Sequence, residues 1–142
     1  MSIKQILDEK GRDVVTVKPT MSTMEAARLL AEYKIGAVIV TGTGGKIGGI
    51  LSERDIVRAV ARDGGGALDK PISSIMTAKV ITCTQDHTIN QVMELMTNGR
   101  FRHLPVEEDG KLVGVISIGD VVRRRIEDVE REAADIKAYI AG

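Results

Sequence analysis

The 142-residue sequence predicts a mixed α/β (α+β) fold, in which one β-α-β-β-α unit occurs twice and a long C-terminal helix follows. Three observations predict it. The segment Val17 to Val40 has a counterpart in Cys83 to Val106, 66 positions further on. Glycine-containing turns separate two short apolar runs in each copy, and apolar residues recur at spacings of four and three near the end of the chain. Such a repeat indicates one supersecondary unit used twice.

Each copy starts with a short β-rich segment, Val14 to Val17 in the first and Val80 to Cys83 in the second. A short helical stretch leads into each of them, at residues 2–11 and 71–77. Gly11 is a suitable C-terminal stop for the first stretch, because glycine readily adopts the backbone conformations that end a helix.

The first long helix of each copy carries an N-terminal capping signature. Ser22 is followed three residues later by Glu25, and Thr88 by Gln91, which predicts a capping box in both helices. Apolar stripes then follow at helical spacing, formed by Ala26, Leu29, Leu30 and Tyr33 in the first helix and by Val92, Leu95 and Met96 in the second. These stripes predict the faces that pack on the core.

Two apolar runs and a closing helix complete each copy. The runs AVIV and KIGGIL in the first copy, and HLPV and KLVGVI in the second, are typical of buried strands joined by a turn. We expect a first domain at residues 1–62 with the N-terminal helix, and a second at 72–142 with the long C-terminal helix. Three consecutive glycines and a closing proline predict a mobile linker at 63–71.

The C-terminal helix carries a coiled-coil-like seam, formed by Val122, Ile126, Val129, Ala133, Ile136 and Ile140. Two interpretations are open. The seam covers its own domain, or it is a contact in a dimer.

Composition excludes several classes of partner. Twenty Lys and Arg balance twenty Asp and Glu, so no net field attracts nucleic acid or anionic lipid, and no apolar run is long enough for a membrane span. We therefore expect no nucleic-acid or membrane partner and a cytoplasmic location. One cysteine and two histidines lack the spacing of metal ligands, so no metal is predicted.

The motif Gly-φ-φ-Ser-x-x-Asp, in which φ is apolar, occurs where each second strand ends and the closing helix begins. It runs from Gly49 through Ser52 to Asp55 in one copy, and its counterpart holds Ser117 and Asp120. Free N–H groups at a helix N-terminus suit a phosphate, and a carboxylate can accept from both ribose hydroxyls. The alternative is that the serines only cap helices and the aspartates only favour the helix dipole.

The two motifs, the β-α-β-β-α repeat and the runs SERDIVR, RFRHLPV and SIGDVV resemble the CBS domain family over residues 2–139. The resemblance implies a pair of CBS domains related by pseudo-twofold symmetry, often called a Bateman module. It also implies two clefts that accept adenosyl ligands, and association of such pairs into homodimers.

The resemblance also implies roles for particular residues. Asp55 and Asp120 would hold ribose, with Ser52 and Ser117 near phosphate. Backbone groups would read adenine, at Gly36, Ala37 and Val38 or at Arg102, His103 and Leu104. Side chains suited to phosphate by their charge are Lys18, Arg54, Arg102 and His103.

The expected function is that of a regulatory protein that is not an enzyme. Its ligand would be AMP, ADP, ATP or NAD(H), and it would sense energy or redox state through an unknown partner protein. One alternative is a dimerisation scaffold with empty clefts, and another is an S-adenosylmethionine-binding CBS pair. A thiol-dependent enzyme using Cys83 is a third.

Overall fold

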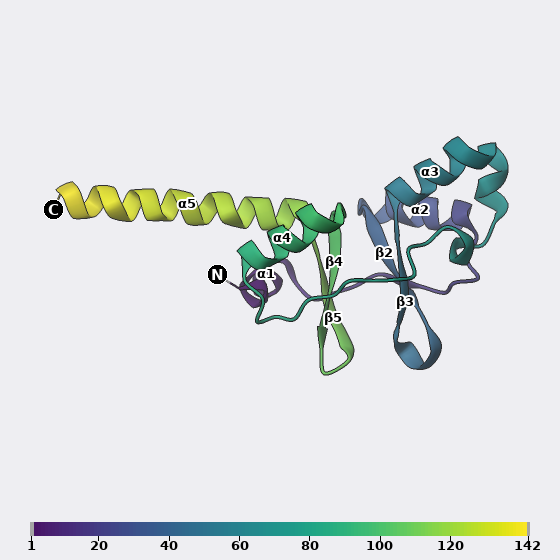
Figure 1. Cartoon of the computed structure of the whole chain (residues 1–142), viewed down its shortest axis with the longest axis horizontal. Coiled ribbons are helices and arrows are strands. Elements are labelled where there is room, and N and C mark those ends of the chain that lie inside the picture. The colour runs from purple at the N-terminus through teal and green to yellow at the C-terminus, as the bar shows by residue number, and fades with distance from the viewer. Residues whose placement is uncertain (1, 142) are drawn as a thin grey trace.

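The computed structural model describes residues 2–141 and contains two α+β halves side by side, from which one long helix projects (Figure 1). The first half holds β1 (Thr16–Val17), α2 (Thr23–Tyr33), β2 (Ala37–Thr41), β3 (Ile47–Ser52) and α3 (Glu53–Asp63). The second half holds α4 (Ile89–Gly99), β4 (His103–Glu108), β5 (Lys111–Ser117) and α5 (Ile118–Ala141), and α1 (Ile3–Lys10) begins the chain. The predicted α+β repeat with its long C-terminal helix is confirmed.

Each half is built on a small sheet. In the first, β1 pairs parallel with β2, which pairs antiparallel with β3, and in the second β4 pairs antiparallel with β5. The register places Ala37 opposite Ser52 and His103 opposite Ser117. The motif serine of each half therefore lies beside the start of the strand that follows the first long helix.

The predicted first strand of the second copy is reduced to a single bridge between Cys83 and Val106. Proline explains this difference. In the first copy the N–H of Ile39 donates to the carbonyl of Val15 at 3.2 Å, and the residue 66 positions after Ile39 is Pro105. Proline has no N–H to donate, so the ladder does not extend in the second copy.

The chain crosses between the halves. Although α1 precedes the first copy, its side chains Ile3, Ile6 and Leu7 pack in the core of the second half, together with Cys83 and residues of α4, β4 and β5. Ile72, which leads into the second copy, packs in the core of the first half. This exchange brings the C-terminal end of α1 to the start of α5.

The predicted helix ends are confirmed in part. Gly11 ends α1 with φ of 98°, and α4 begins with the complete capping box of Thr88 and Gln91. In α2 only half of the box forms, because Ser22 accepts from the N–H of Glu25 but no reciprocal bond is made. Tyr33 departs from the predicted stripe, since it is 56% exposed while Ala26 and Leu30 are buried.

The connection between the copies contains a 3-10 helix, Gly64–Asp69, in which Ala67 is fully buried. Through Ala67 this segment packs on the first half, beside α2 and α3. The predicted linker thus contains a 3-10 helix, and its mobility stays a prediction.

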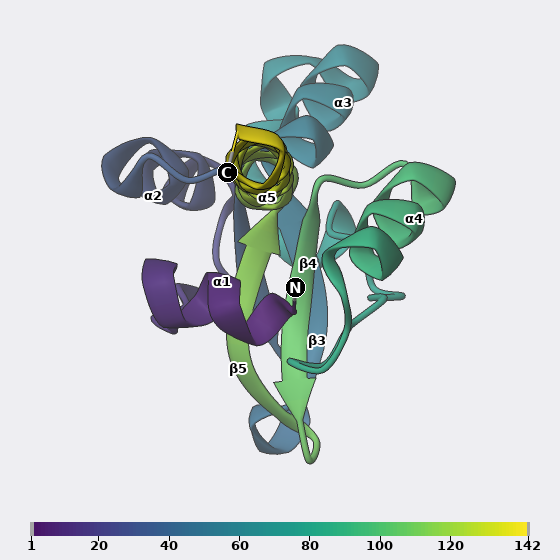
Figure 2. The same cartoon turned by 90° about the vertical axis from the view of Figure 1, so that its left-hand side faces the viewer.

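The helix α5 contacts its own half through one face only. Val121, Arg124 and Asp128 are buried, whereas all six residues of the predicted seam are exposed. The interpretation in which the seam covers its own domain is therefore wrong. Figure 2 looks along α5 and shows α1 and α4 beside it.

Across residues 2–141, no helix combines the length and the apolar character that a membrane span requires.

Candidate functional site

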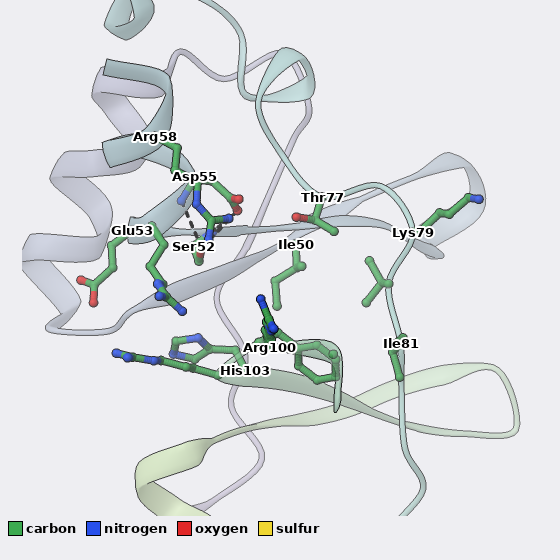
Figure 3. A pocket seen from close by; sticks show the side chains of 15 residues that line it. Ile50, Ser52, Glu53, Asp55, Arg58, Thr77, Lys79, Ile81, Arg100 and His103 are labelled. Carbon is green, nitrogen blue, oxygen red and sulfur yellow. Dashed lines mark hydrogen bonds between the residues drawn. The ribbon is translucent and has the colours of Figure 1, made fainter. Parts of the chain in front are cut away.

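A cavity of about 290 Å³ lies between the two halves, and we call it the Ser52 cleft (Figure 3). Three segments form its walls: the end of β3 with the start of α3, the chain after Met76, and the turn from α4 into β4. Its lining residues are Ile50, Ser52, Glu53, Arg54, Asp55, Arg58, Thr77, Lys79, Val80, Ile81, Gly99, Arg100, Phe101, Arg102 and His103.

The motif pair Ser52 and Asp55 builds the N-terminus of α3. The hydroxyl of Ser52 accepts from the N–H of Asp55 at 3.3 Å, and Oδ2 of Asp55 accepts from the N–H of Ser52 at 2.9 Å and from its hydroxyl at 3.1 Å. These bonds make a capping box that fixes the carboxylate at the cleft wall. Within residues 2–141, no cationic side chain forms an ion pair with Asp55.

The opposite wall is tied to the motif of the second half. The N–H of Ile118, at the start of α5, donates to the carbonyl of Arg102 at 2.8 Å. The first half repeats this bond, because the N–H of Glu53 donates to the carbonyl of Gly36 at 2.9 Å. The third wall is fixed by Thr77, which exchanges two backbone hydrogen bonds with Ile50, each at 2.9 Å. All three walls are thus held by backbone hydrogen bonds.

Cationic side chains outnumber anionic ones in the Ser52 cleft. The cations are Arg54, Arg58, Lys79, Arg100 and Arg102, and the anions are Glu53 and Asp55. Apolar surface comes from Ile50, Val80, Ile81 and Phe101. This lining suits a ligand that has an apolar body and negative charge.

Sequence reasoning missed five of the polar and charged residues that line the Ser52 cleft: Glu53, Arg58, Thr77, Lys79 and Arg100. Arg58 follows Asp55 by three positions on α3, and this helical spacing was an available signal. For Lys79 and Arg100 no local signal existed, because they reach the cleft from separate segments of the chain.

His103 lines the Ser52 cleft and also a second cavity, which lies on its other side toward Ser117. Burial lowers the pKa of His103, although the nearby carboxylate of Glu53 opposes the effect. The imidazole is therefore neutral at pH 7 and offers hydrogen bonds in place of charge. A Cβ at Gly36 would lie 2.9 Å from two atoms of this ring, so glycine at position 36 makes room for it.

The second cavity, of about 480 Å³, is lined by Ser117 and by the first half's Gly36 and Ala37, and we call it the Ser117 cleft. Its motif is built as in the first half: the N–H of Ser117 donates to Oδ2 of Asp120 at 2.9 Å, and the N–H of Asp120 donates to the hydroxyl of Ser117 at 3.2 Å. Charged residues of both signs line it, namely Lys10, Asp13, Lys34 and Glu53.

Lys10 distinguishes the two clefts. Its ammonium donates to Oδ2 of Asp120 at 2.6 Å and to the carbonyl of Val115 at 2.9 Å. Burial alone would raise the pKa of Asp120, but the hydrogen bonds from Lys10 and Ser117 outweigh it and the pKa is lowered. Whereas Asp55 lines the Ser52 cleft, Asp120 lines a smaller hollow on the other side of Lys10.

The remaining predicted residues fall in other places. The side chains of Val38 and Leu104 are buried in the two cores, so only their backbones are available near the clefts. Lys18 lines none of the cavities described above. Arg102 and His103 share a cavity with the motif of the other half, which joins the two copies in one site.

Cys83 is a poor candidate for a nucleophile. Its side chain is 2% exposed, and burial, with a contribution from Glu108, raises its pKa to about 12. The thiol is therefore protonated at neutral pH, and the thiolate is the reactive form. In the described part of the chain, no three His, Cys, Asp or Glu residues gather in a way that could hold a metal ion.

Comparison with solved structures finds close likeness. A CBS-domain-containing protein of Agrobacterium tumefaciens is 54% identical with a TM-score of 0.85, over 87% of this chain and 92% of that one. A CBS domain protein of Pyrobaculum aerophilum complexed with AMP is 32% identical with a TM-score of 0.74, over 84% and 89%. The CBS domain pair of MJ0100, in complex with 5′-methylthioadenosine and S-adenosyl-L-methionine, is 29% identical with a TM-score of 0.80, over 90% and 98%.

Sequence comparison agrees. The mitochondrial CBS domain-containing protein CBSX3 of Arabidopsis thaliana is 34% identical over 122 residues, which are 83% of this chain and 59% of the relative. An uncharacterized 17.7 kDa protein of Acidianus ambivalens is 38% identical over 112 residues, which are 78% of this chain and 66% of that protein. The chain thus spans less than two thirds of the length of either relative. The CBS domain profile matches residues 3–62 and again 72–127, and the chain therefore belongs to the CBS domain family.

Proposed function

We propose that the Ser52 cleft binds an anionic adenine nucleotide, namely AMP, ADP, ATP or NAD(H), and that the protein regulates a partner protein and catalyses no reaction itself. The observation that carries the proposal is an unpaired Asp55 carboxylate facing a cavity in which five cations outnumber two anions. The AMP complex of the Pyrobaculum aerophilum relative supports the same class of ligand.

Each part of the nucleotide has a counterpart in the cleft. The ribose hydroxyls would donate to Asp55, whose position the capping box fixes. Phosphate oxygens would accept from the guanidinium groups of Arg54 and Arg102, which can form two parallel hydrogen bonds each. The adenine would lie against apolar surface at Val80 and Ile81.

Charge argues against S-adenosylmethionine in the Ser52 cleft. Its sulfonium is a cation, and a cavity with a net excess of positive side chains disfavours it relative to a phosphate. Because the MJ0100 pair binds it, S-adenosylmethionine stays the second candidate ligand. The Ser117 cleft suits it better than the Ser52 cleft, since the positive charges of Lys10 and Lys34 are balanced there by Asp13 and Glu53.

The Ser117 cleft would fill second. Asp120 does not line this cleft, and a ribose in it would reach the carboxylate only by displacing the ammonium of Lys10, which holds that carboxylate at 2.6 Å. Among the described residues 2–141, no cation is paired with Asp55 in the Ser52 cleft. We therefore expect the first ligand to bind at Asp55.

Regulation would follow from the position of the Ser52 cleft between the halves. A ligand held by Asp55 on one wall and by Arg102 on the other binds most tightly at one particular distance between these walls. Its binding therefore raises the population of the arrangement of the two halves that has this distance. A partner protein that recognises one arrangement would read that shift. A scaffold with empty clefts is the competing function.

Thermal unfolding with AMP, ADP, ATP, NADH and S-adenosylmethionine tests the proposal, because a ligand specific for the native state raises the midpoint by mass action. We expect the anionic nucleotides to raise it and S-adenosylmethionine to have little effect. Arg102→Gln should weaken the nucleotide effect, while Arg28→Gln, an exposed arginine on α2, should leave it unchanged. A shift with S-adenosylmethionine alone would favour the second candidate, and no shift at millimolar concentration would favour the scaffold.

A further inference from the structure

The exposed seam of α5 lies on the side of the helix that faces away from its own half. Five of its six residues are large and apolar, and they are 41–77% exposed: Val122, Ile126, Val129, Ile136 and Ile140. The face that does contact the second half contains Val121, Arg124 and Asp128. In heptad terms the seam occupies positions a and d, and the contacting residues occupy c and f, on the opposite side of the helix.

The length of α5 leaves this seam open to a partner. The helix has 24 residues and is therefore about 36 Å long. Its C-terminal half projects away from every other element (Figure 1). From Val129 to Ala141 every residue is exposed, so the apolar positions in this part are covered by nothing in the described chain.

The charges that flank the seam decide what fits it. Arg125 and Glu132 occupy g positions, and Glu130 and Lys137 occupy e positions. In a parallel coiled coil each g residue faces the e residue five positions later on the other helix. Arg125 would therefore meet Glu130 of a second copy, and Glu132 would meet Lys137 of a second copy. Both pairs join opposite charges.

The antiparallel arrangement is disfavoured by the same residues. With the seams centred on one another, e positions face e positions and g positions face g positions. Glu130 would then face Glu130 of the other chain, Glu132 would face Glu132, and Arg123 would face Lys137. Each of these contacts joins like charges.

From this charge pattern we propose that α5 pairs in parallel with α5 of a second copy of the chain, through the seam from Val122 to Ile140. The seam residues form the shared apolar strip, and Arg125 with Glu130, and Glu132 with Lys137, form the flanking ion pairs between copies. The face of α5 that contacts its own half, with Val121, Arg124 and Asp128, lies on the opposite side of the helix and stays free of this strip. The proposal concerns α5 alone and does not depend on nucleotide binding.

The test is sedimentation analysis of the full chain, wild type and Arg125→Glu. We expect the wild type to have the mass of two chains. Arg125→Glu turns two attractions per dimer into two repulsions, so it should raise the dissociation constant about tenfold or more. Arg131→Glu makes the same charge change at an f position and should have no such effect.

Mixing separates the parallel pair from a folding defect. Glu130→Arg alone should weaken the dimer as Arg125→Glu does. A mixture of the two variant chains should restore a dimer, because both flanking pairs again join opposite charges in the mixed species. A wild-type monomer at 100 μM or a mass of three chains would overturn the proposal. So would a loss in Arg125→Glu equal to that in Arg131→Glu, or no recovery on mixing.

Discussion

Replacing Lys10 by methionine tests the contact that makes the two clefts different. The substitution removes the ammonium that donates to Asp120 at 2.6 Å and to the carbonyl of Val115 at 2.9 Å, and it keeps an apolar stem of similar length. Methionine is also the residue at the matching place in the first half, because the residue 66 positions after Lys10 is Met76, which packs against the core of that half.

The size of the effect follows from the exposure of the pair. The side chain of Lys10 is 38% exposed and that of Asp120 is 12% exposed, so solvent screens the ion pair in part. We therefore expect the free energy of unfolding at pH 7 to fall by about 1 kcal/mol, the upper end for exposed pairs and well below the value for a fully buried pair. For a chain of this size that is a fall in midpoint of about 3–4 °C.

The pH dependence has a definite sign. Because the pKa of Asp120 is lower in the folded protein than in the unfolded chain, the pair stabilises the fold above about pH 4, and this contribution is lost as the pH falls further. The difference between wild type and Lys10→Met should therefore be largest at neutral pH and shrink in acid.

Urea unfolding from pH 7 to about pH 3 measures both quantities. Lys4→Met is the matched control, since Lys4 is an exposed lysine of the same helix. The reasoning fails if Lys10→Met is as stable as wild type at pH 7. It also fails if the loss is independent of pH or if Lys4→Met shows the same loss.

Three further predictions concern the clefts and the cores. Gly49→Ala should destabilise the fold by about 1–3 kcal/mol in chemical unfolding, because the new Cβ would lie 2.8 Å from the carbonyl oxygen of Thr77, whereas Gly65→Ala, with nothing within 4 Å, should cost much less. Cys83 should react with a thiol reagent only as urea unfolds the chain, since its pKa is raised to about 12, and rapid labelling of the native protein would contradict this. The pKa of His103, followed by NMR, should lie below its usual value near 6.5 and rise when an anionic nucleotide binds; an ordinary pKa in the free protein would show that burial does not act as described.

Much of the fold could be predicted because its signals are local. The repeat fixes the element order, and Ser52 and Asp55 are recognisable because a strand end and a helix start adjoin them in sequence. Even so, α2 lacks the full capping box, since the side chain of Glu25 does not return to the backbone of Ser22. The spacing of Ser22 and Glu25 makes the reciprocal capping bond available but does not ensure that it forms.

The parts that could not be predicted depend on contacts between distant segments. Nothing local to residues 2–11 indicates that they pack with the second copy, and the pairing of Lys10 with Asp120 joins residues 110 positions apart. The part of the Ser52 cleft that Lys79 and Arg100 form likewise depends on contacts between segments that are distant in the sequence. Apolar periodicity predicted the seam of α5, but periodicity alone does not say whether a face is covered.

Calorimetric titration of ADP into wild type, Asp55→Ala and Asp120→Ala tests the central claim most directly. Both substitutions remove the same capping interaction at a helix start, so each is a structural control for the other. We predict that wild type and Asp120→Ala bind a first ADP with similar affinity and that Asp55→Ala loses this binding. Unchanged binding in Asp55→Ala, or its loss in Asp120→Ala alone, would contradict the assignment of the nucleotide to the Ser52 cleft.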